Sequence, residues 1–425
     1  MDKPDFSEAL ELASEAGHIL LENGAEISRV EDIMERIATH YGVSSGNFFV
    51  LSNGIFTTGQ ADKISKAGGQ ASTYANVEFI PLRGIQLSKV KAVNRLSYDI
   101  AADRCTLEMA KQRLKEIKNA PAKPYWEQIL GAAFGAAGFA AVFGGGFADC
   151  SAAFAVGALL QVFILFVSAR HLSKIVGGIS NALLATLLCI LSWKIGLGAS
   201  LSNVVIGAIM PLVPGVPFVN GVRDLANSDY IAGLTRLTDA MLGFFCIALG
   251  VSLGFLTDGA ISGGVIELTG VTVNPETASY LWQALAAFIG TAAFACLFGV
   301  DREQYITTGL VGAAGWIAYL LLVRLAGLTP TVATVAAAVL VALGSRFLAV
   351  PTKCPAQVYL LCGIFPLVPG AGLFWFTYYL TSGNFSLSLT TGFTAAKVAI
   401  AIVLGIILAM EIPQKVFSPN TNKAH

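Results

Sequence analysis

A five-residue motif with two prolines and a glycine occurs twice in the sequence, at 211–215 and at 366–370. Both copies read Pro-Leu-Val-Pro-Gly and both interrupt apolar stretches. Proline removes a backbone donor and obstructs the carbonyl group four residues earlier, so each copy predicts a broken helix. Because unpaired backbone groups are costly in lipid, such a break must be buried in protein or line a wet cavity.

Broken helices direct half-helix N-termini and free carbonyl groups toward one place, and these groups suit the carboxylate and ammonium ends of an amino acid. The paired breaks therefore predict a substrate site. A proline kink without a ligand is the alternative, but the same motif in both halves of the apolar region favours a site. The predicted substrate-binding residues of the motifs are Pro211, Pro214, Gly215, Pro366, Pro369 and Gly370.

Polar residues near the breaks are further candidates. Asn220 follows the first motif, and Asn181 lies in an earlier apolar segment, where it could bind substrate or bridge two helices. Ionisable residues in apolar segments are functional hypotheses by default. For these residues the alternatives are an ion pair at the membrane interface and a lysine that snorkels to water. We expect coupling or gating roles for Asp239, Lys397, Arg223 and Asp224.

The composition of the chain indicates which kind of structure must position these residues. The chain has 425 residues, 55% of them hydrophobic and 13% charged, and residues 1–124 hold 31 of the 54 charged residues. A normally charged region therefore precedes a charge-poor one, which excludes a wholly soluble enzyme and a disordered or fibrous protein. The net charge is zero without a basic stripe, so nucleic-acid binding has no support. Seven scattered cysteines predict no metal site, and no pattern predicts a cofactor.

The charge-poor region divides into ten apolar segments, each close to the ~20 residues that cross a bilayer. With the N-terminus inside, the inside connections carry nine Lys or Arg residues and the outside connections two. This asymmetry predicts that both termini are cytoplasmic and that the protein spans the cell (inner) membrane many times. We expect spans at 127–147, 151–169, 175–193, 200–219, 234–256, 279–299, 305–323, 331–349, 356–380 and 390–411.

One offset relates the two halves of this region. Short identical blocks recur 155 residues apart without gaps, and the longest is the PLVPG motif. A duplication of a five-helix unit follows, and an odd number of spans makes the second copy enter from the opposite side of the membrane. The predicted fold is a polytopic α-helical membrane protein with two inverted five-helix repeats and a small α+β cytoplasmic domain. Its expected parts are that domain at 1–124, repeat 1 at 125–256, an extracytoplasmic loop at 257–278, repeat 2 at 279–411 and a cytoplasmic tail at 412–425.

The first domain combines helical and strand patterns. Two amphipathic helices are expected on either side of Asn23-Gly24, since glycine readily adopts the left-handed conformation that ends a helix. Asn53-Gly54 between two apolar runs predicts a β-hairpin.

The stretch 20–37, which reads LLENGAEISRVEDIMERI, resembles the opening of the threonine/serine exporter family, as does the Tyr41-Gly42-Val43 that follows it. Arg83-Gly84-Ile85-Gln86-Leu87 and Ala92-Val93-Asn94 resemble its second conserved stretch, and the paired PLVPG motifs fit as well. The resemblance extends over nearly the whole chain, which looks like the fused form of a family that includes split members.

The resemblance implies export of small amino acids driven by the proton motive force, with a small-molecule substrate, protons and the lipid bilayer as partners. Related two-component systems make a dicarboxylate such as succinate the alternative substrate. The resemblance also implies a signature in the N-terminal domain, for which a turn with surface ion pairs is the alternative. The signature residues are Asn23, Gly24, Glu26, Arg29, Glu31 and Arg36.

Two other function classes stay open at the level of sequence. A passive channel would need a continuous pore rather than alternating access. A membrane-tethered enzyme would place its chemistry in 1–124, where no GxSxG or HExxH motif and no Cys/His pairing supports it, so we expect no enzyme. The sequence does not distinguish a monomer from a homo-oligomer.

Overall fold

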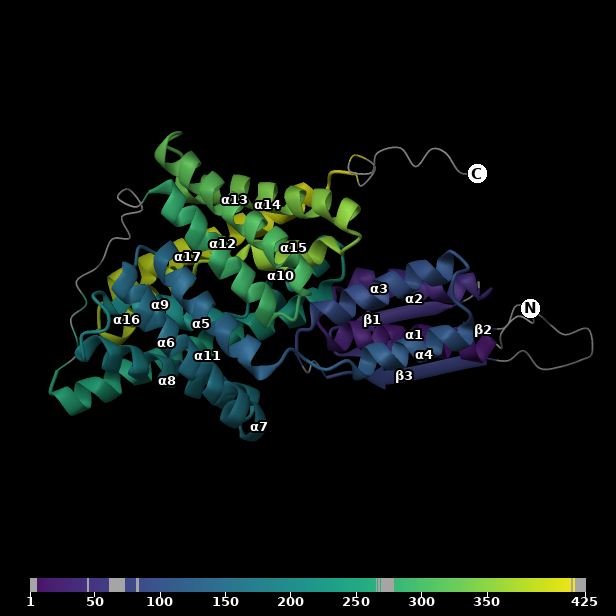
Figure 1. The fold of residues 1–425 in the computed structure, drawn as a ribbon, viewed down its shortest axis with the longest axis horizontal. Coiled ribbons are helices and arrows are strands. Elements are labelled where there is room, and N and C mark those ends of the chain that lie inside the picture. Colours follow the sequence, from purple (N-terminus) through teal and green to yellow (C-terminus); the bar gives the residue numbers. More distant parts are fainter. Residues whose placement is uncertain are drawn as a thin grey trace, which may run out of the picture. The chain divides into compact units, whose positions relative to one another are not determined.

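The computed structural model describes residues 6–43, 46–60, 73–81, 84–264, 266, 268, 279–413 and 416. These residues are mostly helical, with one small sheet near the N-terminus (Figure 1). They form two compact units. The first unit combines the described residues of 1–122 with 216–238, and the second combines 123–215 with the described residues after 238.

In the first unit, four helices accompany a three-stranded antiparallel sheet of order β1-β2-β3. Leu51 pairs with Gly54, which confirms the hairpin predicted at Asn53-Gly54 and the α+β character of this part of the chain. The elements are α1 (Phe6–Glu22), α2 (Ile27–His40), β1 (Asn47–Leu51), β2 (Gly54–Gln60), β3 (Thr73–Phe79), α3 (Leu87–Ala101) and α4 (Leu107–Asn119).

The turn between α1 and α2 has the geometry that its sequence predicts. Gly24 has a φ of 87°, in the left-handed region that glycine adopts without strain. The Ala25 N–H group donates across the turn to the Leu20 carbonyl group at 3.0 Å, as in a Schellman helix end. Asn23 Nδ2 donates to the Ile19 carbonyl group at 2.7 Å. Side chain and backbone together therefore fix the end of α1.

The second unit is helical throughout its described residues. Two further helices, α10 (Gly215–Ala226) and α11 (Tyr230–Ser262), contribute residues to both units. The other elements are α5 (Tyr125–Val142), α6 (Phe147–Phe163), the π-helical η1 (Ile164–Ser168), α7 (Ala169–His171), α8 (Lys174–Lys194), α9 (Leu201–Ile209), η2 (Met210–Leu212), α12 (Tyr280–Leu297), η3 (Arg302–Gln304), α13 (Tyr305–Arg324), α14 (Pro330–Thr352), α15 (Ala356–Gly363), η4 (Phe365–Leu367), α16 (Gly370–Thr381) and α17 (Phe385–Met410).

Among the described residues, seven helices are long and apolar enough to cross a membrane, or up to nine if each of two bent helix pairs is one span. The protein is therefore a multi-pass membrane protein, while the predicted number of ten spans is not confirmed. The predicted span that is missing from these nine is α5, because the polar residues Glu127 and Gln128 in its first turn make it less apolar than the others. The bent pairs are α9–η2 with α10 and α15–η4 with α16.

Local structure recurs at the same 155-residue offset as the sequence. The helix α12 begins and ends 155 residues after α5, and the same holds for η4 after η2 and for α16 after α10. Positive φ values occur at Gly144 and Gly299, and again at Ser228 and Gly383. Some neighbours correspond too: η2 contacts α5 and α8, and η4 contacts α12 and α14, although η4 also contacts α13. The two halves therefore share the same local structure at these positions.

Candidate functional site

Both PLVPG motifs interrupt a helix, as their prolines predict. In the first, α9 passes into the 3-10 turn η2, which contains Pro211, and α10 begins at Gly215 after a bend of 57°. In the second, α15 passes into η4, which contains Pro366, and α16 begins at Gly370 after a bend of 44°. In each motif the glycine N–H group donates to the carbonyl group of the motif's valine at 2.8 Å. Pro214 and Pro369 lie between these two residues, so the predicted broken helices are confirmed.

The two breaks pack against each other reciprocally within the second unit. A Cβ atom on Gly215 would lie 2.4 Å from Phe365 Cζ, and a Cβ atom on Gly370 would lie 2.4 Å from Met210 Sδ. Met210 and Phe365 are related by the same offset as the two glycines, so each contact is the counterpart of the other. Exchanged contacts of this kind fit an approximate two-fold relationship between the two breaks.

The helices α5 and α12 show the same exchange. A Cβ atom on Gly135 would lie 2.9 Å from the Phe294 ring, and one on Gly290 would lie 3.2 Å from the Phe139 ring. Phe139 and Phe294 are themselves 155 residues apart, and their ring centroids are 4.8 Å apart. The same exchange of contacts therefore occurs at the breaks and between α5 and α12.

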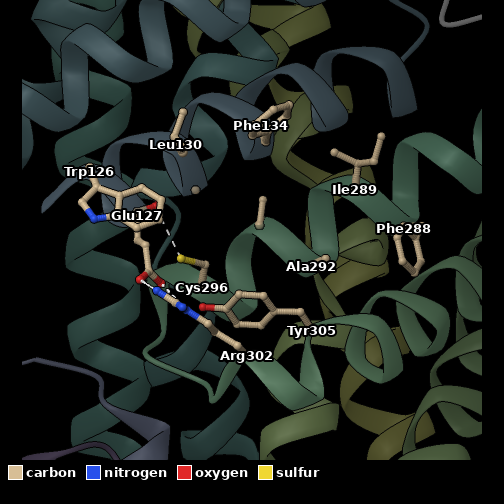
Figure 2. Close-up of a pocket in the computed structure, with 12 residues that line it drawn as sticks. Trp126, Glu127, Leu130, Phe134, Phe288, Ile289, Ala292, Cys296, Arg302 and Tyr305 are labelled. Atoms are coloured by element: carbon tan, nitrogen blue, oxygen red, sulfur yellow. Dashed lines mark hydrogen bonds and ion pairs between the residues drawn. The ribbon is translucent and has the colours of Figure 1, made fainter. Parts of the chain in front are cut away.

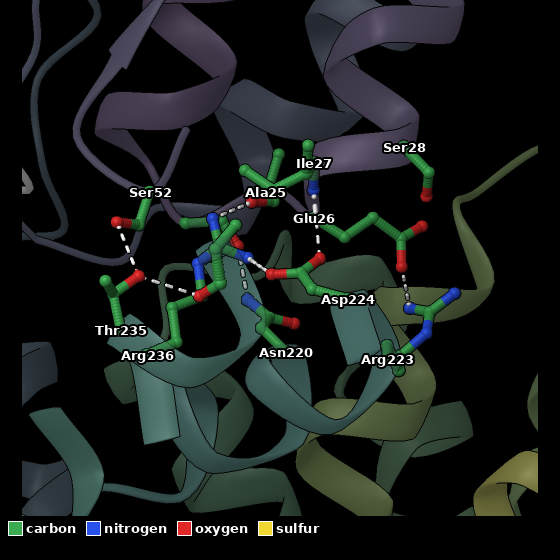
Figure 3. A network of polar contacts seen from close by, with 12 residues as sticks. Ala25, Glu26, Ile27, Ser28, Ser52, Asn220, Arg223, Asp224, Thr235 and Arg236 are labelled. Atoms are coloured by element: carbon green, nitrogen blue, oxygen red, sulfur yellow. Dashed lines mark hydrogen bonds and ion pairs between the residues drawn. The ribbon is translucent and has the colours of Figure 1, made fainter. Parts of the chain in front are cut away.

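Within the first unit, the α1–α2 turn contacts side chains of α10 and α11 (Figure 3). Asn220 Nδ2 donates to the Gly24 carbonyl group at 2.9 Å, and Arg236 Nη2 donates to the Ala25 carbonyl group at 2.8 Å. Carbonyl groups that follow a helix end lack helical partners. Side chains 196 and 211 residues further along the chain supply those partners here.

Asp224 connects the same helices to the start of α2. Its side chain is fully buried, and Oδ1 accepts a hydrogen bond from the Ile27 N–H group at 3.2 Å. Its Oδ2 accepts from Arg236 Nη1 at 2.8 Å. A carboxylate at a helix N-terminus binds an otherwise unpaired N–H group and opposes the positive end of the helix dipole. Asp224 therefore caps α2 from a distant element while Arg236 balances its charge.

Glu26 forms a second buried ion pair, with Arg223, and only 3% of the Glu26 side chain is exposed. Its Oε2 lies 2.5 Å from Arg223 Nη1, and its Oε1 accepts from Arg29 Nε at 3.1 Å. Burial alone would raise the pKa of Glu26, but the nearby guanidinium groups, Arg223 before Arg29, outweigh burial and hold the pKa below its ordinary value. Glu26 is therefore a carboxylate at neutral pH.

The remaining signature side chains bind within the N-terminal part of the chain. Glu31 Oε1 accepts from the Val50 N–H group at 3.1 Å, which joins α2 to β1. Arg36 Nη1 donates to Ser97 Oγ at 2.9 Å, and the Arg36 guanidinium lies 4.3 Å from the centroid of the Tyr98 ring. Glu31 and Arg36 thus connect elements of the N-terminal part, whereas Glu26 contacts α10, the helix that follows the first break.

Three predicted residues lie outside this network. Asp239 accepts a hydrogen bond from Lys174 at 2.5 Å, and 43% and 68% of these side chains are exposed. Lys397 is exposed on α17. Asn181 is buried on α8, a helix that contacts η2, and its Oδ1 has no hydrogen-bond partner among the described residues.

Three residues in the contacts described above, Arg236, Met210 and Phe365, were not among the residues predicted from the sequence. Arg236 lies in an apolar segment and would have been found by the rule that selected Asp239, because both are ionisable groups in such a segment. Met210 and Phe365 stand at equivalent positions directly before the first proline of each motif. An explicit alignment of the two copies would have marked them as a pair of large residues facing a pair of glycines.

A separate cavity of about 420 Å³ lies in the second unit, between α5, α12 and the start of α13 (Figure 2). Its walls are mainly apolar, with side chains such as Leu130 and Phe134. At its polar end Glu127 forms an ion pair with Arg302, and Cys296 Sγ donates to the Glu127 carbonyl group at 3.4 Å. None of the predicted substrate-binding residues lines this cavity.

Comparison with known proteins places these features in a family. A family model for threonine/serine exporters matches residues 11–257, and a second model with that description matches residues 283–412. A threonine/serine exporter from Corynebacterium glutamicum is 23% identical over 424 residues, which are 98% of this chain and 85% of the relative. A protein named a probable threonine/serine exporter, from Mycobacterium tuberculosis, is 25% identical over 77% of this chain and 62% of the relative.

A third relative carries a different name. The protein named a probable succinate transporter subunit, from Escherichia coli, is 26% identical over 246 residues, which are 56% of this chain and 91% of the relative. No solved structure matches the chain. Because a family model matches more than half of its residues, the chain belongs to the threonine/serine exporter family.

Proposed function

We propose that this protein exports small amino acids, threonine and serine foremost, as a proton-coupled secondary transporter of the cell (inner) membrane. The observation that carries the proposal is the reciprocal packing of the two PLVPG breaks, Gly215 on Phe365 and Gly370 on Met210. Membership of the exporter family supports the substrate class. Paired broken helices between two copies of one unit are the arrangement in which many secondary transporters bind substrate.

In this proposal ten spans form two inverted repeats of five helices. The helix α5 provides the tenth span, because its counterpart α12 has the same bounds at the 155-residue offset and is long and apolar enough to cross a membrane. Five spans per copy place the second copy upside down, which fits the exchanged contacts. Both termini and the domain at 1–124 then lie in the cytoplasm, and residues 257–278 lie outside.

The substrate lies at the breaks, where α10 and α16 begin. Pro211, Pro214, Pro366 and Pro369 keep the helices from continuing, which leaves backbone carbonyl groups for the substrate ammonium and helix N-termini for its carboxylate. The unused acceptor of buried Asn181 supports a donor group of the substrate nearby, because buried polar atoms without a partner are rare. Asn220 already donates from Nδ2 to the Gly24 carbonyl group, so it would contact substrate beside the α1–α2 turn.

Proton coupling and gating involve the ionisable residues of the candidate spans, Asp239, Lys397, Arg223 and Asp224. Asp239 is the first of these, because Lys174 is the one cation paired with its carboxylate among the described residues, and the carboxylate is partly open to water. Protonation of Asp239 would release Lys174 and so alter how α8 and α11 are held at this end. Such a change can link proton uptake to movement.

The proposal is tested by efflux from proteoliposomes that contain the purified protein and L-threonine or L-serine. We expect efflux that saturates with substrate concentration and that proceeds against a substrate gradient when a pH gradient is imposed. Flux that never saturates would indicate a channel instead. Threonine, serine and succinate fluxes that all ignore the pH gradient would contradict proton-coupled export.

A dicarboxylate is the second candidate substrate. It is favoured by relatives named as probable succinate transporter subunits, which match more than half of this chain. Succinate and threonine share a carboxylate, but only threonine carries an ammonium group. Competition between succinate and threonine in the same proteoliposomes distinguishes the two candidates. The preferred substrate is the one that inhibits efflux of the other compound at the lower concentration.

A further inference from the structure

Arg223 and Arg236 are both buried cations beside the α1–α2 turn, but Arg223 has fewer hydrogen-bond partners than Arg236. Arg236 donates from Nη1 to Asp224 and from Nη2 to the Ala25 carbonyl group. Arg223 is equally buried, with 10% of its side chain exposed, yet its Nε forms no hydrogen bond among the described residues. Its one partner there is the ion-paired carboxylate of Glu26. A buried guanidinium has five donors to satisfy, so Arg223 has unused capacity for a second acceptor.

Glu26, by contrast, can leave Arg223 without becoming an unpaired buried charge. Its other oxygen already accepts from Arg29 Nε at 3.1 Å on the same helix. Asp224 and Asn220 would continue to hold the α1–α2 turn through Ile27 and Gly24. An incoming carboxylate could therefore replace Glu26 on Arg223 without dismantling the rest of the network.

We propose that Arg223 is a capture site for the carboxylate of the exported substrate, and that Glu26 is the internal carboxylate which occupies this site until substrate displaces it. The inference rests on the proposed export function and adds a second binding position to it. Arg223 lies eight residues after Gly215 on α10, or about 12 Å along the helix at 1.5 Å per residue, so it is distinct from the break. Guanidinium groups bind carboxylates through two parallel hydrogen bonds, which explains why an arginine serves here.

The test is the apparent KM for L-threonine, applied at the side of the N-terminal domain, in proteoliposomes with full-length variants. R223K keeps the charge but loses the planar pair of donors, so we expect its KM to rise about tenfold. E26D keeps a charge near Arg223 and Arg29 but weakens the internal competitor, so we expect its KM to fall about threefold. R36K is the matched control, because Arg36 bonds Ser97 elsewhere in the domain, and its KM should equal that of the wild type.

A second readout addresses the ligand directly. Wild-type protein should be inhibited far more by L-threonine than by L-threonine methyl ester, and this preference should largely disappear in R223K. Should a single variant fold poorly, E26Q/R223Q removes both charges together and avoids a lone buried ion. Its KM should also be high.

Two results would overturn the inference. One is R223K with an unchanged KM and an unchanged preference for the acid over the ester. The other is E26D with a KM that rises in parallel with that of R223K, since the pair would then be structural only. Absence of saturable threonine efflux in the wild type contradicts the export function itself, which separates the two failures.

Discussion

Gly215 and Phe365 meet where the two broken helices approach each other, so closely that a Cβ atom on Gly215 would lie 2.4 Å from Phe365 Cζ. Real Cβ atoms essentially never come that close to another heavy atom. The counterpart contact joins Gly370 to Met210 Sδ. The two contacts are equivalent in position but not in stiffness, because an aromatic ring yields less than the flexible end of a methionine side chain.

This difference predicts unequal effects of alanine at the two glycines. We expect Gly215→Ala to destabilise the packing at the breaks by about 1–3 kcal/mol and to reduce efflux strongly, whereas Gly370→Ala should be milder because Met210 can move aside. Efflux from proteoliposomes at matched protein levels measures this. Gly344→Ala on α14 is the control, since a Cβ atom there meets nothing within 4 Å. Equal efflux from all three variants would show that the contact has no role in transport.

The prolines of the motifs give a second prediction. We expect Pro214→Ala and Pro369→Ala each to reduce transport without preventing membrane insertion, because alanine restores a backbone donor and lets the helix continue. Pro214 has a further contact, since a Cβ atom on Gly243 of α11 would lie 2.9 Å from it. Insertion is checked by the amount of protein in the membrane fraction. Full transport by the double variant would remove the motif from the mechanism.

Features that depend on neighbouring residues could be predicted from the sequence. The broken helices follow from the prolines, the end of α1 from Asn23-Gly24, and the hairpin from Asn53-Gly54, because each is decided by backbone conformations within a few residues. At the 155-residue offset, α5, η2 and α10 have counterparts with the same bounds, while the inverted repeats stay a prediction. That α5 spans the membrane, which would give five spans per copy, stays a prediction. Its first turn is too polar for composition alone to decide.

The contacts of the signature residues could not be predicted in this way. Glu26 was expected to belong to a turn with surface ion pairs or to have a functional role, and it is in fact buried beside Arg223. No periodicity links residues almost 200 positions apart, and one sequence offers no co-variation between them. Asp224 was placed near the first break for its charge, but its bond to the Ile27 N–H group depends on how the domain at 1–124 folds.

Glu26 and Glu31 should give opposite pH dependence of stability, although both lie on or beside α2. The pKa of Glu26 is lowered in the fold, because Arg223 and Arg29 outweigh burial. Glu26 therefore contributes stability above its unfolded pKa of about 4.5 and loses it as pH falls through the lower folded value. Burial raises the pKa of Glu31, with neighbouring acidic residues adding to the effect, so its ionised form costs stability at neutral pH.

Thermal unfolding of the full-length protein in detergent tests whether Glu26 and Glu31 have opposite effects on the pH dependence of stability. At pH 7 we expect Glu26→Gln to lower the Tm clearly, because it leaves Arg223 without its partner, and this loss should shrink toward pH 4. Glu31→Gln should raise the Tm slightly at pH 7 and leave it unchanged near pH 4, because glutamine can still accept the bond from Val50. Parallel pH profiles for the two variants would contradict the opposite signs.

The last prediction concerns proton coupling through Asp239. Among the described residues, α8 and α11 are joined by two ion pairs, Lys174 with Asp239 and Lys194 with Asp258, and the carboxylate of Asp239 is much more exposed than that of Asp258. We expect Asp239→Asn to abolish efflux driven by a pH gradient while downhill exchange of threonine continues. Its stability should change by less than about 1 kcal/mol, because exposed ion pairs contribute little.

Asp258→Asn is the matched control for this variant. Asp258 is 7% exposed and also lies 3.4 Å from Ser262 Oγ, so its loss should lower the Tm without uncoupling transport from the proton gradient. Measuring both variants separates a coupling role from a purely structural one. If Asp239→Asn still drives threonine uphill on a pH gradient, Asp239 is not the coupling residue, and buried Asp224 becomes the carboxylate to test next.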